Sequence, residues 1–122
     1  MPKIMVVDDD KEFTFLYSRY LEMVGFEVIA ENQSSKAMTL ANSTRPDLFV
    51  LDLMMPDPDG FKLCRMLRAN MSFMHTPIII VTALNDEDSR VVAFGAGAND
   101  YLTKPFHIDD LKSRIDLLLE KF

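Results

Sequence analysis

Apolar and polar residues follow one another along this chain in blocks of two kinds. Five short runs are rich in β-branched and other apolar residues and have no helical period, which is typical of strands buried on both faces of a sheet. These runs lie at residues 3–7, 26–30, 48–52, 78–82 and 99–103. Between and after them come longer segments in which apolar residues recur every three or four positions. The pattern therefore predicts five strands that alternate with helices.

The clearest helical pattern begins at Lys11. Its apolar residues recur at positions i, i+3, i+4, i+7, i+8 and i+11, which places them on one stripe of a helix. Asp10 is placed to cap this helix, and Gly25 is placed to end it. The stripe consists of Phe13, Leu16, Tyr17, Tyr20, Leu21 and Val24.

Four further helices are predicted along the rest of the chain. They lie at residues 34–43, 60–70 and 85–95 and from His107 to Phe122. Asp59 can cap the helix at 60–70, whose inward residues are Leu63, Cys64 and Leu67. The helix at 85–95 has few large apolar residues, so we expect it to be the least firmly packed.

Strands and helices alternate five times, and this order predicts the class of fold. Such alternation favours an α/β domain with a parallel sheet, helices on both faces and right-handed crossovers. The length suits a single domain. We expect one domain over residues 1–122, either a complete protein or part of a longer one.

Composition and charge narrow the class of protein. The formal charge of −6 disfavours direct binding of nucleic acid. A single cysteine cannot form an internal disulfide, which is compatible with a reducing compartment. The sequence has no signal-peptide pattern at its start and no apolar run of membrane-spanning length. We therefore expect a cytoplasmic protein that makes no membrane contact.

Polar residues follow four of the five predicted strands. Asp8 and Asp9 come after the first strand and Asp52 ends the third, while Thr82 and Lys104 follow the fourth and fifth. In open parallel sheets the ligand site lies beyond the carboxyl ends of the strands. Each residue alone could be a turn or cap residue, but their joint placement indicates one site at this edge.

The three carboxylates at this edge would repel one another, and a divalent cation would relieve the repulsion. Magnesium favours carboxylate oxygens and commonly completes its ligand shell with phosphate oxygens. The cluster therefore predicts a magnesium site that receives a phosphoryl group. Lys104 and Thr82 would then bind oxygens of that group, and Asp52 would be the nucleophile that becomes an aspartyl phosphate.

These residues lie in motifs that resemble the receiver domain of bacterial two-component response regulators. The similar segments are Val6 to Asp10, Leu51 to Gly60, Val81 to Ala83 and Gly97 to Phe106, in the family's order over essentially the whole chain. The resemblance implies a flavodoxin-like (CheY-like) doubly wound fold. That fold has five helices and a five-stranded parallel sheet of strand order 2-1-3-4-5.

The resemblance also implies a role for each residue of the site. Asp52 would accept a phosphoryl group from a sensor histidine kinase or a phosphotransfer protein. The ligands of Mg²⁺ would be Asp8, Asp9, Asp52 and the Met54 backbone carbonyl. Thr82 and Lys104 would bind the phosphoryl group, and Tyr101 would be an aromatic switch that follows Thr82. The peptide bond before Pro105 would be cis.

The resemblance further predicts how the signal leaves the site and how long it lasts. The moving surface would be that of helix 85–95, strand 99–103 and the last helix, through which homodimerisation is common in the family. In fast-hydrolysing receivers, side chains two residues after the acceptor and two after the threonine place the attacking water. Here these are Met54 and Leu84, which are apolar, so we expect a long-lived aspartyl phosphate.

Three alternatives compete with this interpretation. A magnesium-dependent phosphohydrolase with an aspartyl-phosphate intermediate would resemble Asp-x-Asp at the strand end, but Met54 stands at the second acidic position. A flavin-binding domain would need a hydroxyl- and glycine-rich loop after the first strand, where residues 8–12 are mostly acidic. A receiver that only binds partners is disfavoured because all five polar site residues are present.

Overall fold

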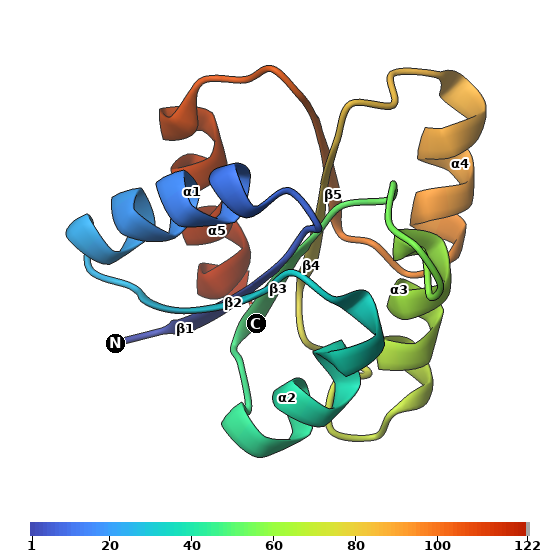
Figure 1. The fold of residues 1–122 in the computed structure, drawn as a ribbon, viewed down its shortest axis with the longest axis horizontal. Helices are drawn as coiled ribbons and strands as arrows, with labels where there is room; N and C mark the ends of the chain where they lie inside the picture. Colours follow the sequence, from blue (N-terminus) through green and yellow to red (C-terminus); the bar gives the residue numbers. More distant parts are fainter. Residues whose placement is uncertain (122) are drawn as a thin grey trace.

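A single parallel sheet forms the centre of the molecule, and its strand order is β2-β1-β3-β4-β5 (Figure 1). The computed structural model describes residues 1–121. The strands are β1 (Lys3–Val7), β2 (Glu27–Glu31), β3 (Leu48–Leu51), β4 (Ile78–Thr82) and β5 (Asp100–Thr103). The predicted α/β class and the strand order implied by the resemblance are confirmed.

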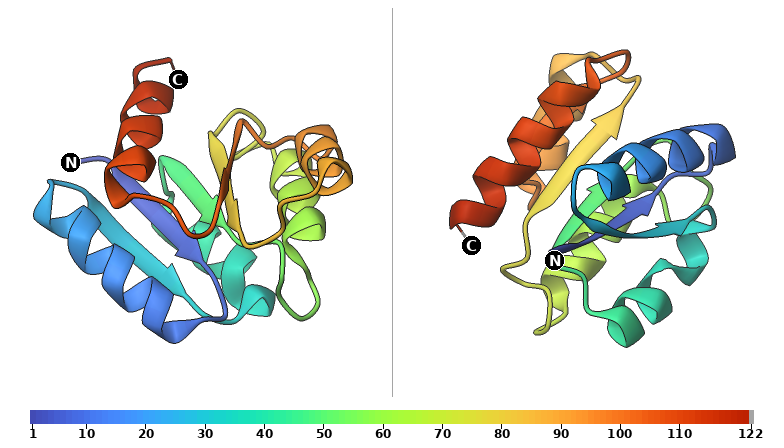
Figure 2. Two further views of the ribbon diagram at one scale, coloured as in Figure 1. Left: turned by 90° about the horizontal axis from the view of Figure 1, so that it is seen from above. Right: turned by 90° about the vertical axis from the view of Figure 1, so that its left-hand side faces the viewer.

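Five α-helices connect and follow the strands. They are α1 (Lys11–Met23), α2 (Ala37–Thr44), α3 (Gly60–Ala69), α4 (Glu87–Gly95) and α5 (Ile108–Lys121), with a short 3₁₀ turn, η1 (Ser34–Lys36), ahead of α2. Helices α1 and α5 cover one face of the sheet, and α2, α3 and α4 cover the other (Figures 1 and 2). No helix of residues 1–121 is long and apolar enough to cross a membrane.

The sheet separates two apolar cores. Alternate residues of β1 enter opposite cores: Ile4 and Val6 pack with α1 and α5, whereas Met5 and Val7 pack with α2, α3 and α4. All four residues of β3 and all five of β4 are buried. Burial on both faces explains why these strands read as unbroken apolar runs rather than alternating patterns.

The helix ends follow the local chemistry of the sequence. The Asp10 carboxylate accepts hydrogen bonds from the backbone N–H groups of Glu12 and Phe13, as predicted for the cap of α1. Asp59 caps α3 in the same way through Lys62 N–H. Gly25 follows α1 with a φ of 105°, a left-handed conformation that only glycine adopts without strain.

Some predicted boundaries differ from the structure by one or two residues. Strand β2 begins at Glu27 rather than at residue 26, helix α5 begins after His107, and η1 replaces the first turn of the second predicted helix. Helix α4 begins at Glu87 because Asp86, inside the predicted helix, is its N-cap and accepts the Ser89 N–H. The predicted end of the last helix, Phe122, lies outside the described residues.

The predicted apolar stripe of α1 is wrong at one residue, Leu16. Leu16 is 55% exposed, whereas Thr14, a polar residue, is buried. The stripe that faces the sheet is centred on Phe13, Tyr17 and Leu21, so Leu16 falls on its margin. Thr14 can be buried because its hydroxyl donates to the Lys11 carbonyl and accepts from the Asn32 amide.

Helix α4 is weakly packed, as predicted. Ala93 is its only buried residue. Its three larger apolar side chains, Val91, Val92 and Phe94, are all substantially exposed. This helix therefore has little apolar surface that holds it to the sheet.

Candidate functional site

The register of the central strands brings two acids together at the carboxyl edge of the sheet. Val7 of β1 pairs with Leu51 of β3, so the next residues, Asp8 and Asp52, leave the sheet side by side. The backbone continues the pairing one step further, because Asp52 N–H donates to the Val7 carbonyl at 3.1 Å. Both acids are buried, with 1% and 7% of their surface exposed.

Lys104 reaches these two acids from the loop after β5. Its backbone N–H donates to the Thr82 carbonyl at 2.8 Å and so extends the pairing of β4 with β5. Its ammonium nitrogen Nζ lies 2.8 Å from Asp8 Oδ2 and 3.1 Å from Asp52 Oδ2. The peptide bond to Pro105 is cis, as the resemblance implies. One lysine thus joins the ends of β1, β3 and β5.

Burial and charge set the electrostatics of this cluster. Burial raises the pKa of Asp8 to about 6, and the charge of Asp52 adds to the rise, although hydrogen bonds from Lys104 and the Asp10 N–H oppose it. Burial would lower the pKa of Lys104, but Asp8 and Asp52 outweigh it and raise that pKa. With both acids ionised, the cluster of two carboxylates and one ammonium has one negative charge in excess.

That excess charge suits a hard cation such as magnesium, and the oxygen donors present fit one. Two carboxylates are in place, and the Met54 backbone lies beside them because its N–H donates to Asp52 Oδ1 at 3.0 Å. Asp9 is exposed, and its carboxylate makes no hydrogen bond or ion pair to this cluster. Within residues 1–121, no three His, Cys, Asp or Glu side chains converge as a metal-binding group. The ligand role of Asp9 therefore stays a prediction.

Thr82 lies at the same edge, but its hydroxyl makes no hydrogen bond to Asp8 or Asp52. It ends β4 and is fully buried, and its hydroxyl oxygen accepts the Leu84 N–H at 3.4 Å. The structure thus places Thr82 in the predicted row of strand ends. Its hydroxyl is engaged by the start of the β4–α4 connection rather than by Asp52 or Lys104.

Tyr101 is buried one strand away, with 2% of its surface exposed. Its hydroxyl donates to the Leu84 carbonyl at 2.8 Å, which ties β5 to the β4–α4 connection. The Arg90 guanidinium of α4 lies 4.7 Å from the centre of its ring. Burial raises the pKa of Tyr101, so the phenol keeps its proton and remains a donor at neutral pH. Thr82 and Tyr101 therefore contact the same residue, Leu84.

Close packing fixes the loop that carries Asp52. A Cβ on Gly60 would collide with the Asp52 carbonyl oxygen and would lie 2.5 Å from Leu53 Cα, so only glycine fits there. The Gly60 N–H donates to the Leu53 carbonyl, and the Ser34 hydroxyl donates to the Pro56 carbonyl. A second cis peptide bond, Asp57–Pro58, lies in this loop and was not predicted.

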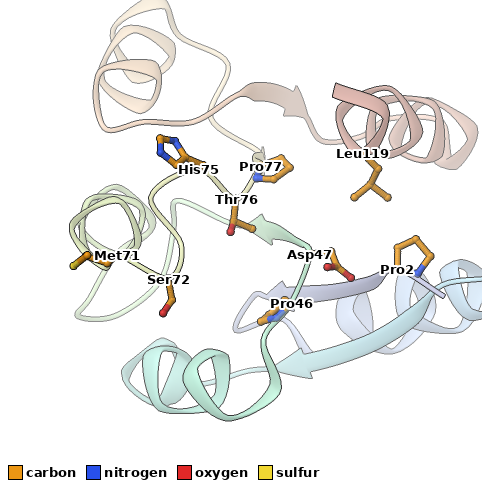
Figure 3. Close-up of a pocket in the computed structure, with 9 residues that line it drawn as sticks. All are labelled: Pro2, Pro46, Asp47, Met71, Ser72, His75, Thr76, Pro77 and Leu119. Atoms are coloured by element: carbon orange, nitrogen blue, oxygen red, sulfur yellow. The ribbon is translucent and has the colours of Figure 1, made fainter. Parts of the chain in front are cut away.

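A pocket lies elsewhere, at the opposite edge of the sheet (Figure 3). It has a volume of about 610 Å³, and Pro2, Pro46 and Pro77, which precede β1, β3 and β4, line it together with Leu119 of α5. None of the acids described above borders it. The titratable groups described above therefore meet at the carboxyl edge of the sheet and not in this pocket.

Two contacts of the site residues could not be predicted from the sequence. The helical period predicts only that Phe13 belongs to the apolar stripe of α1, yet Lys104 Nζ lies 4.0 Å from the centre of its ring. Arg90 was not singled out, yet it covers Tyr101. Both contacts join segments that are distant in the chain, and no spacing rule relates them.

The chain was compared with known proteins. A sequence model of the response regulator receiver domain family matches residues 4–116. The chain is 39% identical over 121 residues to the "DNA-binding dual master transcriptional regulator RpaA" of Synechocystis sp., a match that covers 99% of this chain and 50% of that protein. It is 40% identical over 118 residues to the "Transcriptional regulatory protein GltR" of Pseudomonas aeruginosa, with 97% and 49% covered.

A solved structure shows the same fold. The chain superposes on the BeF3-activated N-terminal receiver domain of Klebsiella pneumoniae RstA with a TM-score of 0.90 and 33% identity, covering 96% of this chain and 97% of that one. By contrast, the chain spans about half the length of the curated relatives it matches.

Proposed function

Because this chain belongs to the family of response regulator receiver domains of two-component systems, we propose that it is a phosphoacceptor switch whose acceptor is Asp52. The observation that carries the proposal is the contact of one lysine with two buried acids. Asp52 is held beside Asp8, and Lys104 Nζ lies within 3.1 Å of both. This arrangement offers an anionic nucleophile together with a fixed positive charge for a phosphoryl oxygen.

The proposed reaction is transfer from a phosphohistidine of a sensor histidine kinase or a phosphotransfer protein. An Asp52 carboxylate oxygen attacks phosphorus, the P–N bond to the donor imidazole breaks, and its electron pair returns to that imidazole. Positioning and charge neutralisation provide most of the catalysis in such a transfer. Here Met54 N–H orients the nucleophile through Oδ1, and Lys104 is placed to bind the incoming group.

Asp8, Asp9, Asp52 and the Met54 carbonyl are the proposed ligands of Mg²⁺. When bound, the ion would offset the negative charge that the carboxylates and the phosphoryl group bring together. The excess negative charge of Asp8 and Asp52 over Lys104 supports this assignment. So does the raised pKa of Asp8, which indicates a carboxylate in need of a further positive neighbour.

We propose that the signal leaves through the face formed by α4, β5 and α5. The Thr82 hydroxyl would turn from Leu84 N–H to the new phosphoryl group, and Tyr101, which donates to the Leu84 carbonyl, would register that change. The weak packing of α4 supports its role as the moving element. Its exposed Val91, Val92 and Phe94 offer apolar surface to a partner or to a second copy of the domain.

The relatives named above are described as transcriptional regulators, and we propose transcription in the cytoplasm as the process that this switch controls. Direct contact with nucleic acid by the receiver domain itself is disfavoured by its charge of −6. The phosphohydrolase alternative gains no support, because Met54 stands where that class has a second acid and its side chain is apolar and exposed.

The proposal is tested by intact mass spectrometry after incubation with acetyl phosphate and MgCl₂. We expect the mass of one phosphoryl group on the wild-type chain and none on Asp52→Asn, which keeps the size of the side chain but removes the nucleophilic carboxylate. Asp57→Asn, in the exposed part of the same loop, is the control that should still be labelled. Labelling of Asp52→Asn to the wild-type level would refute Asp52 as the acceptor.

A further inference from the structure

An aromatic ring completes the surroundings of the Lys104 ammonium. Phe13 lies in the first turn of α1, and Lys104 Nζ is 4.0 Å from the centre of its ring, well within the range of a cation–π contact. Nζ has three N–H groups, and two of its neighbours are the carboxylates of Asp8 and Asp52. The ring is therefore a third neighbour of Nζ, and it carries no charge.

The ring is held in place from several sides. The Phe13 N–H is bound by the Asp10 cap at 3.1 Å, which fixes the start of the helix that carries it. Its ring centroid lies 4.2 Å from that of Tyr17 and 6.5 Å, edge to face, from that of Phe106. Phe13 is 8% exposed, so the ring faces Lys104 from a rigid and largely dry position. Cation–π attraction is strongest in such desolvated settings.

We propose that Phe13 is a positioning residue for Lys104, whose ring face holds the ammonium at the acceptor Asp52. This inference rests on the proposed function of the site. The four-carbon stem of lysine has many rotamers, and a contact that selects one of them keeps the charge where a phosphoryl oxygen would arrive. An aliphatic side chain could fill the same space, but it would not attract the ammonium.

The ring matters most when the carboxylates change their state. Once Asp52 becomes an acyl phosphate, the oxygen that faces Lys104 is no longer that of a free carboxylate. Asp8 can likewise be engaged by another cation. The Phe13 ring neither titrates nor reacts, so it remains a constant neighbour of Nζ through the transfer and preserves the position of the lysine.

The test varies the ring face while keeping its shape. Phenylalanine analogues with one, two and three ring fluorines are introduced at position 13, since each fluorine weakens the negative face of the ring with little change in size. Phe13→Leu removes the ring altogether. Phe73→Leu removes a buried ring in the core on the other face of the sheet, packed edge to face on Phe49, and serves as the control for lost aromatic packing.

Two measurements are made on each protein. The first is the chemical shift of the Lys104 side-chain protons next to Nζ in metal-free protein, which the ring current of Phe13 should displace upfield. The second is the rate of phosphorylation by acetyl phosphate with MgCl₂. We expect the rate to fall stepwise along the fluorine series and by about three- to tenfold in Phe13→Leu, where the upfield displacement is also lost. Phe73→Leu should keep both close to wild type.

A rate that does not change along the fluorine series would overturn the proposal, because a purely structural role is insensitive to the charge distribution of the ring. So would a Lys104 shift that is the same in wild type and Phe13→Leu. If the wild-type chain takes no phosphoryl group, the proposed function fails instead. The proton shifts then still decide whether Phe13 holds Lys104.

Discussion

The ionised form of Asp8 lowers the stability of the folded protein, because this carboxylate is buried beside a second negative charge. Burial and the charge of Asp52 raise the pKa of this carboxyl group from 3.8 to about 6. The folded state therefore holds the proton more tightly than the unfolded chain. By linkage, the contribution of Asp8 to the free energy of unfolding is most favourable below pH 4. This contribution falls as the pH rises through about 6 and stays at its least favourable value above that.

Asp8→Asn should therefore stabilise the metal-free protein at neutral and alkaline pH. We expect the free energy of unfolding to rise by about 1–3 kcal/mol at pH 8, with the gain shrinking between pH 6 and pH 4 as the wild-type acid takes up its proton. Urea unfolding at pH 4, 6 and 8 in EDTA measures it. Asp9→Asn, at the exposed neighbouring position, should change stability by less than about 0.5 kcal/mol. A gain in Asp8→Asn that is equal at all three pH values would contradict the linkage.

Gly60 is the residue whose size most directly controls the acceptor loop. A methyl group there would meet the backbone of Asp52 and Leu53, which cannot rotate away as a side chain could. Gly60→Ala should lower the free energy of unfolding by about 2–3 kcal/mol and slow phosphorylation of Asp52. Gly95→Ala is the matched control, because nothing lies within 4 Å of its added Cβ.

In the helical setting of α4, Gly95→Ala should be neutral or stabilising by up to about 1 kcal/mol. Chemical unfolding and the acetyl phosphate assay, applied to both variants, check the pair. Equal destabilisation by the two substitutions would show that the close approach at Gly60 does not decide the outcome.

Met54 and Leu84 bear on the lifetime of the proposed aspartyl phosphate. The Met54 side chain is 54% exposed at the mouth of the site, and neither it nor Leu84 can orient an attacking water. Met54→Asn places an amide there and should shorten the half-life of phosphorylated Asp52 by about three- to tenfold. Met71→Asn, a similar change at an exposed position away from the site, should leave the half-life unchanged. Decay is followed by phosphate-affinity gel electrophoresis after removal of acetyl phosphate.

At the scale of elements, one arginine of α3 joins two connections, α3–β4 and α4–β5. The Arg68 guanidinium donates to the carbonyls of Phe73 and Thr76 in the α3–β4 connection and to the carbonyl of Gly97 after α4. It also donates to Asn99 Oδ1, just before β5. Burial lowers the pKa of Arg68, although it stays far above neutrality and the side chain remains charged. The end of the weakly packed α4 is thus held by side-chain hydrogen bonds from Arg68 to Gly97 and Asn99.

Arg68→Ala should lower the free energy of unfolding by about 2–4 kcal/mol, since several partly buried acceptors lose their donor together. Arg68→Lys keeps the charge but not the planar fork, so its loss should be intermediate. Arg65→Ala, exposed on the same helix, should change stability by less than about 0.5 kcal/mol. Hydrogen exchange adds a local readout: amides of α4 should exchange faster in Arg68→Ala, and unchanged exchange there would contradict the anchoring role.

At the scale of the whole molecule, the proposed binding of Mg²⁺ at the carboxyl edge would be coupled to folding. Any ligand that binds only the folded state raises the melting temperature. MgCl₂ should therefore stabilise the wild-type chain at pH 8, and less so at pH 5, where Asp8 holds a proton. Asp8→Asn should reduce the effect at both pH values. Thermal unfolding with MgCl₂ or EDTA measures it, and an equal effect in Asp8→Asn would argue against Asp8 as a ligand.

How far the sequence predicts this molecule depends on the kind of contact involved. Strand ends and caps are local, so the apolar runs and Asp10 or Asp59 lead directly to the elements observed. The meeting of Asp8, Asp52 and Lys104 follows from topology, because parallel strands end at one edge. The side-chain contacts do not follow: Asp9 is exposed and makes no hydrogen bond to the cluster, and the Thr82 hydroxyl accepts the Leu84 N–H. The sequence pattern also does not predict contacts between segments that are distant in the chain, such as those of Arg68, Arg90 and Phe13.

The prolines ahead of the strands, described above only as the lining of a pocket, have a consequence for strand register. Strand β4 is Ile78-Ile79-Ile80-Val81-Thr82 and is buried on both faces, so sliding it by one residue against β3 would exchange one apolar face for another at little hydrophobic cost. Polar groups at the start of β4 select one register.

The Pro77 carbonyl accepts the Phe49 N–H, and the Ile78 N–H donates to Asn99 Oδ1. Pro77 itself has no N–H that could add a further hydrogen bond between the strands. A slip of one residue would move Thr82 by about 3.3 Å relative to Asp52. Pro77 and Asn99, at the opposite edge of the sheet, thus set the alignment of the site.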